Sequence, residues 1–309
     1  MTQNTIKNIT IATRNSPLAM WQAEYAAALI EKTFPHIKTT LLPMTTKGDQ
    51  ILDVTLNKIG GKGLFLKELE QAMLAGEADI AVHSMKDVPA DMPEGFTICS
   101  VFKRHDASDA FVSNKFNALE QLPQGAVVGT SSLRRQSQLL AARPDLNIKP
   151  LRGNVQTRLR KLDEDQYDAI ILATAGLERM ELDNRINSKL TPNDWLPAVG
   201  QGAVGVECLS KQTDLIDLLG QLNDDTSRQC VDAERAMNKV LNGSCSVAIG
   251  AYAQKQDNNL SMHAIVCAPD GSQFIRQHAQ AQNAQELGEN IAQQLLADGA
   301  QAILDLADD

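Results

Sequence analysis

The clearest sign of chemistry in this 309-residue chain is a run of basic side chains between residues 128 and 161. One residue of this run, Asp145, is acidic, whereas the whole chain has a formal net charge of −9. Guanidinium groups donate paired hydrogen bonds that match carboxylates and phosphates. We therefore expect a site for a small polyanion, with its donors among Arg134, Arg135, Arg143, Lys149, Arg152, Arg158, Arg160 and Lys161.

Several arginines stand where a predicted strand ends and a predicted helix begins. Such junctions occur near residues 14–16, 130–135 and 152–154. The free backbone N–H groups of a first helical turn favour anions. We interpret Arg143, Arg160 and Lys161 as a solvated helix face. The junction arginines are interpreted as ligand contacts, and they are Arg14, Arg134, Arg135 and Arg152.

A second candidate is the turn that contains Lys86 and Asp87, after a predicted buried strand over residues 79–84. Ligands of open α/β sheets bind at the carboxyl ends of the strands. In a cleft lined by arginine, Asp87 would be the one carboxylate able to stabilise a developing cation or to move a proton. His83 we interpret as a core residue.

Cys245 lies between a predicted helix over 226–241 and a strand that begins at Val247. Asn242 and Gly243 end the helix, because both tolerate the left-handed conformation found at helix C-termini. A lone cysteine is most often a small buried side chain. The other interpretation is a thiol held on a loop to form a covalent bond, and the local residues leave both open.

Two apparent nucleotide-binding motifs fail on their context. Residues 200–205 match G-x-G-x-x-G, but a proline-containing loop precedes them and a β-like run follows, where a dinucleotide site needs a strand and then a helix. Residues 56–63 lack the first Gly and the Ser/Thr of a phosphate-binding P-loop. We interpret Lys58 and Lys62 as the basic tip of a flexible loop.

Predicted strands and helices alternate over the first two thirds of the chain. This alternation predicts two α/β units with parallel sheets covered on both faces. Ser16 and Pro17 begin the first helix as N-cap and first helical residue. The strands are predicted at 6–13, 37–42, 79–84, 126–129, 146–151, 169–173 and 203–208, and the other helices at 64–74, 132–143 and 154–163.

The pattern changes after about residue 225. Apolar runs at 247–253, 260–267 and 272–279 predict an antiparallel meander, and the periodicity of 284–297 predicts a helix over one face. We therefore predict an α/β protein with a small C-terminal α+β domain.

Composition excludes several classes of protein. The five cysteines are scattered and odd in number, which fits a reducing cytoplasm better than a disulfide framework. The sequence has no CxxC or HxxxH pair, so we expect no dedicated metal site. The negative charge argues against nucleic-acid binding. No apolar run approaches a membrane span, and residues 1–10 do not look like a signal peptide.

Together these motifs resemble those of the porphobilinogen deaminase (hydroxymethylbilane synthase) family over nearly the whole chain. The matching segments appear in the family's order, and several are long. They are Ala12–Ala19, Gly63–Phe65 with Lys67–Glu70, Val82–Pro89, Gly129–Arg135, Leu151–Val155 with Thr157–Leu159, Ala173–Leu177, Pro197–Gly202, and Glu234–Ala236 followed by Gly243–Cys245.

The resemblance implies two lobes like those of periplasmic binding proteins, with a cleft between them, and a small third domain. Residues 1–104 and 203–222 would form domain one, 105–202 domain two and 225–309 domain three. The resemblance also implies a cytoplasmic monomer.

The chemistry that the resemblance implies is a transferase reaction in tetrapyrrole (haem) biosynthesis. Cys245 would hold a dipyrromethane cofactor through a thioether. Four porphobilinogen units would be added with loss of ammonia, and hydroxymethylbilane would be released by hydrolysis. Asp87 would be the catalytic residue. Because each pyrrole carries acetate and propionate groups, an arginine-rich cleft in an acidic protein fits this substrate.

Matching motifs imply three groups of binding residues. Contacts to the cofactor would come from Lys86, Ser132, Arg134, Arg135 and Arg158. Contacts to the substrate would come from Arg14, Ser16, Arg152 and Arg179, while Lys58 and Lys62 would lie on a loop over the cleft. The chain departs from the family at Ala248, where a proline is usual. A proline would stiffen the entry to the strand, so its absence affects the rigidity of the loop and not the chemistry of the thiol.

Two other functions are compatible with the arginine-rich junctions. A non-catalytic protein could bind a small polyanion between the same two lobes, but simple binding needs neither a loop cysteine nor Asp87. A phosphate-transfer enzyme could also use the arginines, but the failed P-loop and the lack of an acidic metal site count against it.

Overall fold

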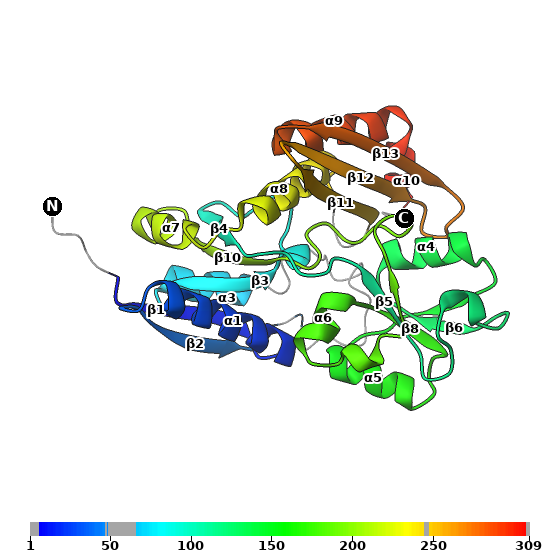
Figure 1. Cartoon of the computed structure of the whole chain (residues 1–309), viewed down its shortest axis with the longest axis horizontal. Coiled ribbons are helices and arrows are strands. Elements are labelled where there is room, and N and C mark those ends of the chain that lie inside the picture. The colour runs from blue at the N-terminus through cyan, green and yellow to red at the C-terminus, as the bar shows by residue number, and fades with distance from the viewer. Residues whose placement is uncertain (1–5, 47, 49–65, 244–246, 307–309) are drawn as a thin grey trace.

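The computed structural model describes residues 6–46, 48, 66–243 and 247–306. Two five-stranded sheets and one three-stranded sheet form its framework (Figure 1). In this part of the chain no helix has the length and apolar character needed to cross a membrane. The predicted α/β fold with a small C-terminal α+β part is confirmed.

The first sheet has the strand order β2-β1-β3-β10-β4. Helices α1 and α7 cover one face, where Ile30 and Leu219 meet Ile11, and α3 covers the other face through Leu69. The elements are β1 (Asn8–Arg14), α1 (Pro17–Thr33), β2 (Lys38–Met44), α3 (Lys67–Ala75), β3 (Ile80–Ser84), η2 (Met85–Asp87), β4 (Phe96–Val101), β10 (Val204–Leu209) and α7 (Thr213–Gly220).

The second sheet has the order β7-β6-β8-β5-β9. Leu139 of α4 packs on one face, while Leu159 of α5 and Leu177 of α6 pack on the other. Its elements are β5 (Asp109–Val112), η3 (Leu119–Gln121), β6 (Val127–Gly129), α4 (Leu133–Ala142), β7 (Asn147–Lys149), α5 (Val155–Asp163), β8 (Ala169–Ala173), α6 (Thr174–Arg179), η4 (Asp183–Arg185) and β9 (Ser188–Leu190).

Neither sheet is purely parallel, which corrects the prediction from the sequence. In the first sheet β10 runs antiparallel to β3 and β4, and in the second β5 runs antiparallel to β8 and β9. Both are the first strands after the chain crosses from one sheet to the other. A strand that arrives directly from the other sheet starts at the carboxyl ends of the neighbouring parallel strands, so it runs in the opposite direction.

The two crossing segments run side by side at the centre of the molecule. The backbone N–H of His105 donates to the carbonyl of Gly202 over 3.1 Å. Gly202 has φ +88°, and a Cβ there would lie 2.7 Å from the His105 oxygen. Glycine is required here both for the positive φ and for the close approach. The strand β10 follows this segment, so the prediction that a strand and not a helix comes after residues 200–202 is confirmed.

The third sheet is the predicted antiparallel meander, and it lies over the junction of the other two (Figure 1). Met237, Leu287 and Ile291 of the helices pack on its inner face. Ala248 and Ile265 on the other face contact Leu196 and α4. The elements are α8 (Asp225–Val240), β11 (Ala248–Gln256), β12 (Asn259–Cys267), β13 (Phe274–Ala281), α9 (Ala284–Ala297) and α10 (Ala300–Asp305).

Elements with a strong local signal were predicted well, whereas short elements were missed. The helices starting after Asn154 and Asn283 have the predicted ends, and both asparagines cap the helix through their side chains. The elements β4, β5, β9, α6, α7 and α10 were not predicted from the sequence. The division into three domains at the stated boundaries stays a prediction.

Candidate active site

Two cavities open on either side of the short turn Met85–Asp87. The smaller has a volume of about 300 Å³ and the larger about 520 Å³. We call the smaller one the α8 cavity, because the C-terminal end of α8 lines it, and the larger one the α1 cavity, because the first turn of α1 lines it. The residues that line both are Lys86, Asp87, Arg135, Arg152 and Arg158.

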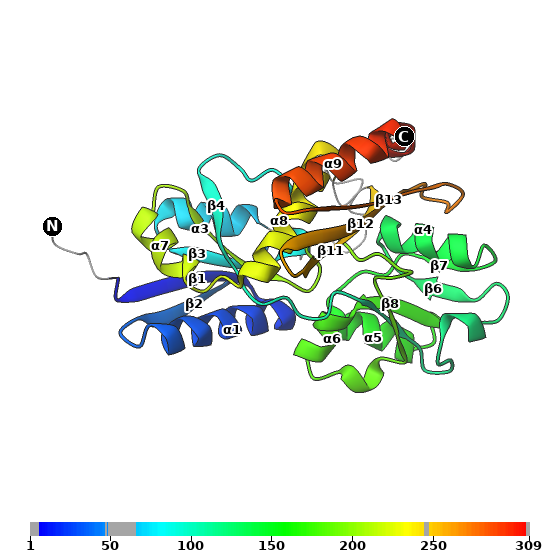
Figure 2. The same cartoon turned by 45° about the horizontal axis from the view of Figure 1, so that its top comes forward.

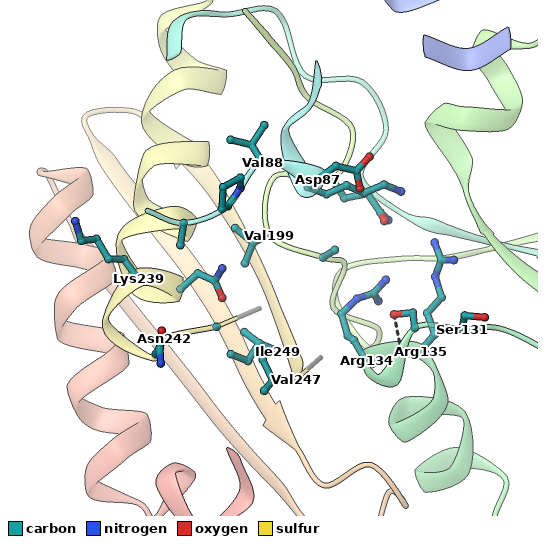
Figure 3. Close-up of a pocket in the computed structure, with 18 of the residues that line it drawn as sticks. Asp87, Val88, Ser131, Arg134, Arg135, Val199, Lys239, Asn242, Val247 and Ile249 are labelled. Atoms are coloured by element: carbon teal, nitrogen blue, oxygen red, sulfur yellow. Dashed lines mark hydrogen bonds between the residues drawn. The ribbon is translucent and has the colours of Figure 1, made fainter. Parts of the chain in front are cut away.

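The α8 cavity lies between the turn of Asp87 and the C-terminal end of α8 with the start of β11 (Figure 3). Arg134 and Arg135 extend from α4 toward Asp87 on one side, while Asn242, Val247 and others form the facing wall. Gly243 and Val247 both line this cavity, so the chain enters and leaves the cysteine segment at its wall. Cys245 itself lies outside the described residues, as do Lys58 and Lys62.

The α1 cavity lies between the first two sheets at the carboxyl ends of their strands. Arg14 ends β1, and Ser84 ends β3. Ala173 ends β8 on the opposite side, and Gly153 belongs to the turn before α5. This is the position at which open α/β sheets bind ligands.

Helix starts contribute to both cavities as expected, with one difference at Ser16. The side chain of Ser132 accepts a hydrogen bond from Arg135 N over 3.4 Å, and that of Asn154 accepts one from Thr157 N over 2.8 Å. Ser16 occupies the N-cap position before Pro17, but its side chain makes no capping bond in the structure as described. The Ser16 hydroxyl therefore remains available at the wall of the α1 cavity.

Asp109 is a buried partner of the arginines that sequence reasoning missed. Its Oδ2 accepts from Arg134 Nη1 over 2.9 Å, and its Oδ1 accepts from Arg135 Nη2 over 2.6 Å. Trp195 and Gln201 donate to the same carboxylate. Although burial raises the pKa of Asp109, the two guanidinium groups outweigh it and hold that pKa well below its usual value.

One carboxylate thus compensates two guanidinium groups, which leaves positive charge at the cavity wall. The sequence offered little indication of this role for Asp109, because a single acidic residue at the start of a short strand is common in proteins. Its partners lie 25 and 26 residues away in the chain, and only the fold brings them together.

Burial lowers the pKa of the cations around Asp87. For Lys86 it lowers the pKa to about 8, against the opposing effect of Asp87. For Arg158 it lowers the pKa to about 10, with Arg135 and Arg152 adding to the effect. A carboxylate bound beside these groups would favour their charged forms. The wall is therefore suited to an anion carrying several carboxylates.

Arg179 reaches the α1 cavity from the end of α6. Its Nη2 donates to the carbonyl of Gly202 over 2.7 Å, and its guanidinium carbon lies 5.5 Å from the ring centroid of Trp21. Burial lowers its pKa to about 10.

The segment Glu234-Arg235 ties α8 to the rest of the site. Glu234 is fully buried and accepts from Arg104 Nη1 over 2.6 Å, from Gly200 N over 2.7 Å and from the N–H of β11 residue Ala253 over 2.8 Å. Arg235 donates to the backbone carbonyls of residues 88–90, directly after Asp87. Sequence reasoning gave these two residues no role beyond the motif.

Three residues outside the cavity walls bear on the sequence interpretations. His83 is buried, with its Nε2 2.8 Å from Glu207 Oε2, so the interpretation as a core residue is confirmed. Arg143 is half-buried and donates to the carbonyls of Leu119 and Leu122, so it supports a loop and is not a solvated residue. Arg160 is exposed as expected.

The structure brings most of the predicted site residues to the two cavities. Among the described residues, no group of three His, Cys, Asp or Glu could hold a metal ion. The predicted residues at the walls are Arg14, Ser16, Lys86, Asp87, Ser132, Arg134, Arg135, Arg152, Arg158 and Arg179.

Comparison with known proteins gives two family matches that together cover most of the chain. Residues 9–217 match the model of the porphobilinogen deaminase, dipyromethane cofactor binding domain, and residues 228–297 match the porphobilinogen deaminase C-terminal domain. A porphobilinogen deaminase of Laribacter hongkongensis is 53% identical over 97% of this chain and 98% of its own length. One of Thiobacillus denitrificans is 54% identical over 96% and 98%.

Solved structures with a similar fold are more distant. The VFT2 domain of Bordetella pertussis BvgS shares 14% identity, with 74% of this chain and 92% of that chain covered at a TM-score of 0.46. A putative methionine-binding lipoprotein of Bacillus subtilis shares 12%, with 72% and 94% covered at a TM-score of 0.42. Likeness at this level carries no argument about a ligand.

Proposed function

This chain belongs to the porphobilinogen deaminase family, and we propose that it joins four porphobilinogen molecules with loss of ammonia and releases hydroxymethylbilane by hydrolysis. The observation that carries the proposal is the place of Asp87 in the wall between two arginine-lined cavities, one of which adjoins the cysteine segment. A non-catalytic binding protein would need neither feature.

The α8 cavity fits the dipyrromethane cofactor that the family domain binds. Such a group carries several carboxylates, and the wall offers cations and a hydroxyl to receive them. When bound, dipyrromethane supplies the nucleophilic pyrrole carbon to which the first substrate unit is joined. In this proposal Cys245 holds it through a thioether, and its carboxylates meet Lys86, Ser132, Arg134, Arg135 and Arg158.

The α1 cavity would receive the incoming porphobilinogen. The acetate and propionate of the substrate are matched by guanidinium and hydroxyl donors from both sheets. Lys58 and Lys62 would add positive charge from the segment that lies outside the described residues. The other proposed substrate contacts are Arg14, Ser16, Arg152 and Arg179.

Asp87 would act on the developing positive charge. Loss of ammonia from the aminomethyl group of the substrate leaves an electron-poor pyrrole, whose ring N–H becomes more acidic. The Asp87 carboxylate can accept a hydrogen bond from this N–H and stabilise the cationic form before the new carbon–carbon bond is made. It can also hold the proton that leaves the ring carbon after bond formation.

We further propose that the three sheets mark the three domains with the predicted boundaries, and that the enzyme acts as a cytoplasmic monomer. The crossings near residues 105 and 202 support the division, because in the described part of the chain two segments join the first two sheets there.

The decisive test of the proposed function is mass spectrometry of the purified active protein. We expect the intact mass to exceed that of the polypeptide by one dipyrromethane unit, and the extra mass to map to the peptide that contains Cys245. Peptides with the other four cysteines serve as internal controls and should be unmodified. Full activity with an unmodified Cys245 would refute the covalent anchor.

A further inference from the structure

Helices α1 and α6 make a direct contact between the first two sheets. They lie next to each other in both views (Figures 1 and 2). A Cβ on Gly176 would be 3.6 Å from the Leu18 side chain, so the Leu18 side chain packs beside α6 at this point. Trp21 and Arg179 meet three residues further along each helix. This contact therefore links one wall of the α1 cavity to the other.

The Arg179 guanidinium is held in this contact by two interactions. Its carbon lies over the Trp21 ring, 5.5 Å from the centroid, and its Nη2 donates to the Gly202 carbonyl over 2.7 Å. Arg179 Nε is buried, and the described residues offer it no hydrogen-bond partner. A cation over an indole face is attracted more strongly when water is excluded, and Arg179 and Trp21 are both half-buried.

Trp21 is itself fixed by aromatic neighbours. Its ring stacks on Tyr25 with centroids 5.4 Å apart and an interplanar angle of 7°. Tyr25 in turn meets the edge of Phe102 at 5.8 Å, and Phe102 is buried at the start of the segment that crosses to the second sheet. Trp21 does not line the α1 cavity, whereas Arg179 does.

We propose that Trp21 is a positioning residue that holds the Arg179 guanidinium at the wall of the α1 cavity, ready to bind a carboxylate of the incoming porphobilinogen. A pre-positioned arginine loses less side-chain freedom when the anion binds, so the affinity for the substrate is higher. The inference rests on the proposed function, in which Arg179 is a substrate contact.

The test is steady-state kinetics of the holoenzyme with porphobilinogen. Trp21→Leu keeps an apolar side chain but removes the π face, so we expect KM to rise about three- to tenfold and kcat to change by less than about twofold. Trp21→Phe retains an aromatic face and should restore most of the affinity. Mass spectrometry of cofactor loading and thermal unfolding of each variant exclude a general folding defect.

A double-mutant cycle separates positioning from simple packing. If Trp21 acts through Arg179, then Trp21→Leu should have no further effect on KM in an Arg179→Gln background. Additive effects on KM, or equal effects of Phe and Leu at position 21, would overturn the inference while leaving the proposed function intact. An unchanged KM for Arg179→Gln alone would instead show that the substrate role of Arg179 is wrong.

Discussion

At the scale of single residues, cations outnumber acids among the described residues that line the two cavities. The negative charge of Asp109 is compensated by its ion pairs with Arg134 and Arg135. Asp87 is the acid that lines both cavities. In the proposed function its negative charge would stabilise the positive charge that develops on a pyrrole, while the cations would bind the carboxylates of the ligands.

Replacing Asp87 by Asn should reduce kcat by at least about 100-fold, because the amide keeps the shape but neither stabilises a cation nor accepts a proton. Fold and cofactor loading should be retained, as judged by circular dichroism and intact mass. Asp165→Asn is a matched control, since Asp165 is exposed and Asn also tolerates its φ of +55°. Near-normal turnover of Asp87→Asn would rule out the assigned role.

Lys86 should make stability depend on pH in the protein without its cofactor, obtained as Cys245→Ser. Burial lowers the folded-state pKa to about 8, against 10.5 as the ordinary value. Between these pH values the unfolded chain binds more protons than the folded one, so the contribution of Lys86 to the free energy of unfolding rises with pH.

In that Cys245→Ser background, Lys86→Met should therefore be stabilising below pH 8, with a gain that shrinks between pH 8 and 10.5. Urea unfolding at several pH values measures the difference. Lys211→Met, at an exposed position, is the control and should change the free energy of unfolding only slightly. A pH-independent effect of Lys86→Met would contradict the burial of a charged amine.

At the scale of elements, the geometry of the cleft depends on how the two crossing segments pass each other. The carbonyl of Gly202 accepts from His105 N and also from Arg179 Nη2, so one backbone group connects the crossing to the substrate side of the cleft. The positive φ at this residue keeps the two segments in contact.

Gly202→Ala should destabilise the protein by about 1–3 kcal/mol, because its Cβ would lie 2.7 Å from the His105 oxygen at a φ of +88°. Gly220→Ala is the matched control. It lies in α7, where a Cβ would have no neighbour within 4 Å, and it should stabilise by about 0.5–1 kcal/mol. Thermal unfolding should show shifts of opposite sign, and equal shifts would contradict the steric argument.

At the scale of the whole molecule, α8 connects the three sheets to the site. Glu234 holds the segment after Phe102 through Arg104, the returning segment through Gly200 and the third sheet through Ala253. Arg235 next to it holds the backbone after Asp87. The helix α8 is therefore held in a fixed position relative to the turn of Asp87.

Glu234→Gln should cost about 3–5 kcal/mol of unfolding free energy, because it leaves Arg104 buried without its charge partner. Asp232→Asn on the same helix removes an i,i+4 pair with Arg228 that is partly exposed, so it should cost less than about 1 kcal/mol. Urea denaturation of both variants makes the comparison. Similar costs for the two would show that Glu234 does not join the sheets as the contacts suggest.

The sequence by itself determined the elements with strong local signals and several of the residues that line the two cavities. Helices with an asparagine cap and regular apolar spacing had the correct bounds, and the arginine junctions and the Asp87 turn were identified. These features depend on neighbours within one or two helical turns, so a single sequence contains the information.

Only the tertiary structure decided the contacts between distant parts of the chain. Asp109 meets Arg134, Arg179 meets Trp21, and β10 returns antiparallel to the first sheet. Each contact joins residues 25 or more positions apart, and its formation depends on the packing of whole sheets and not on local preference. For that reason the sequence determined which groups could bind a polyanion, and the fold decided which of them face the cavities.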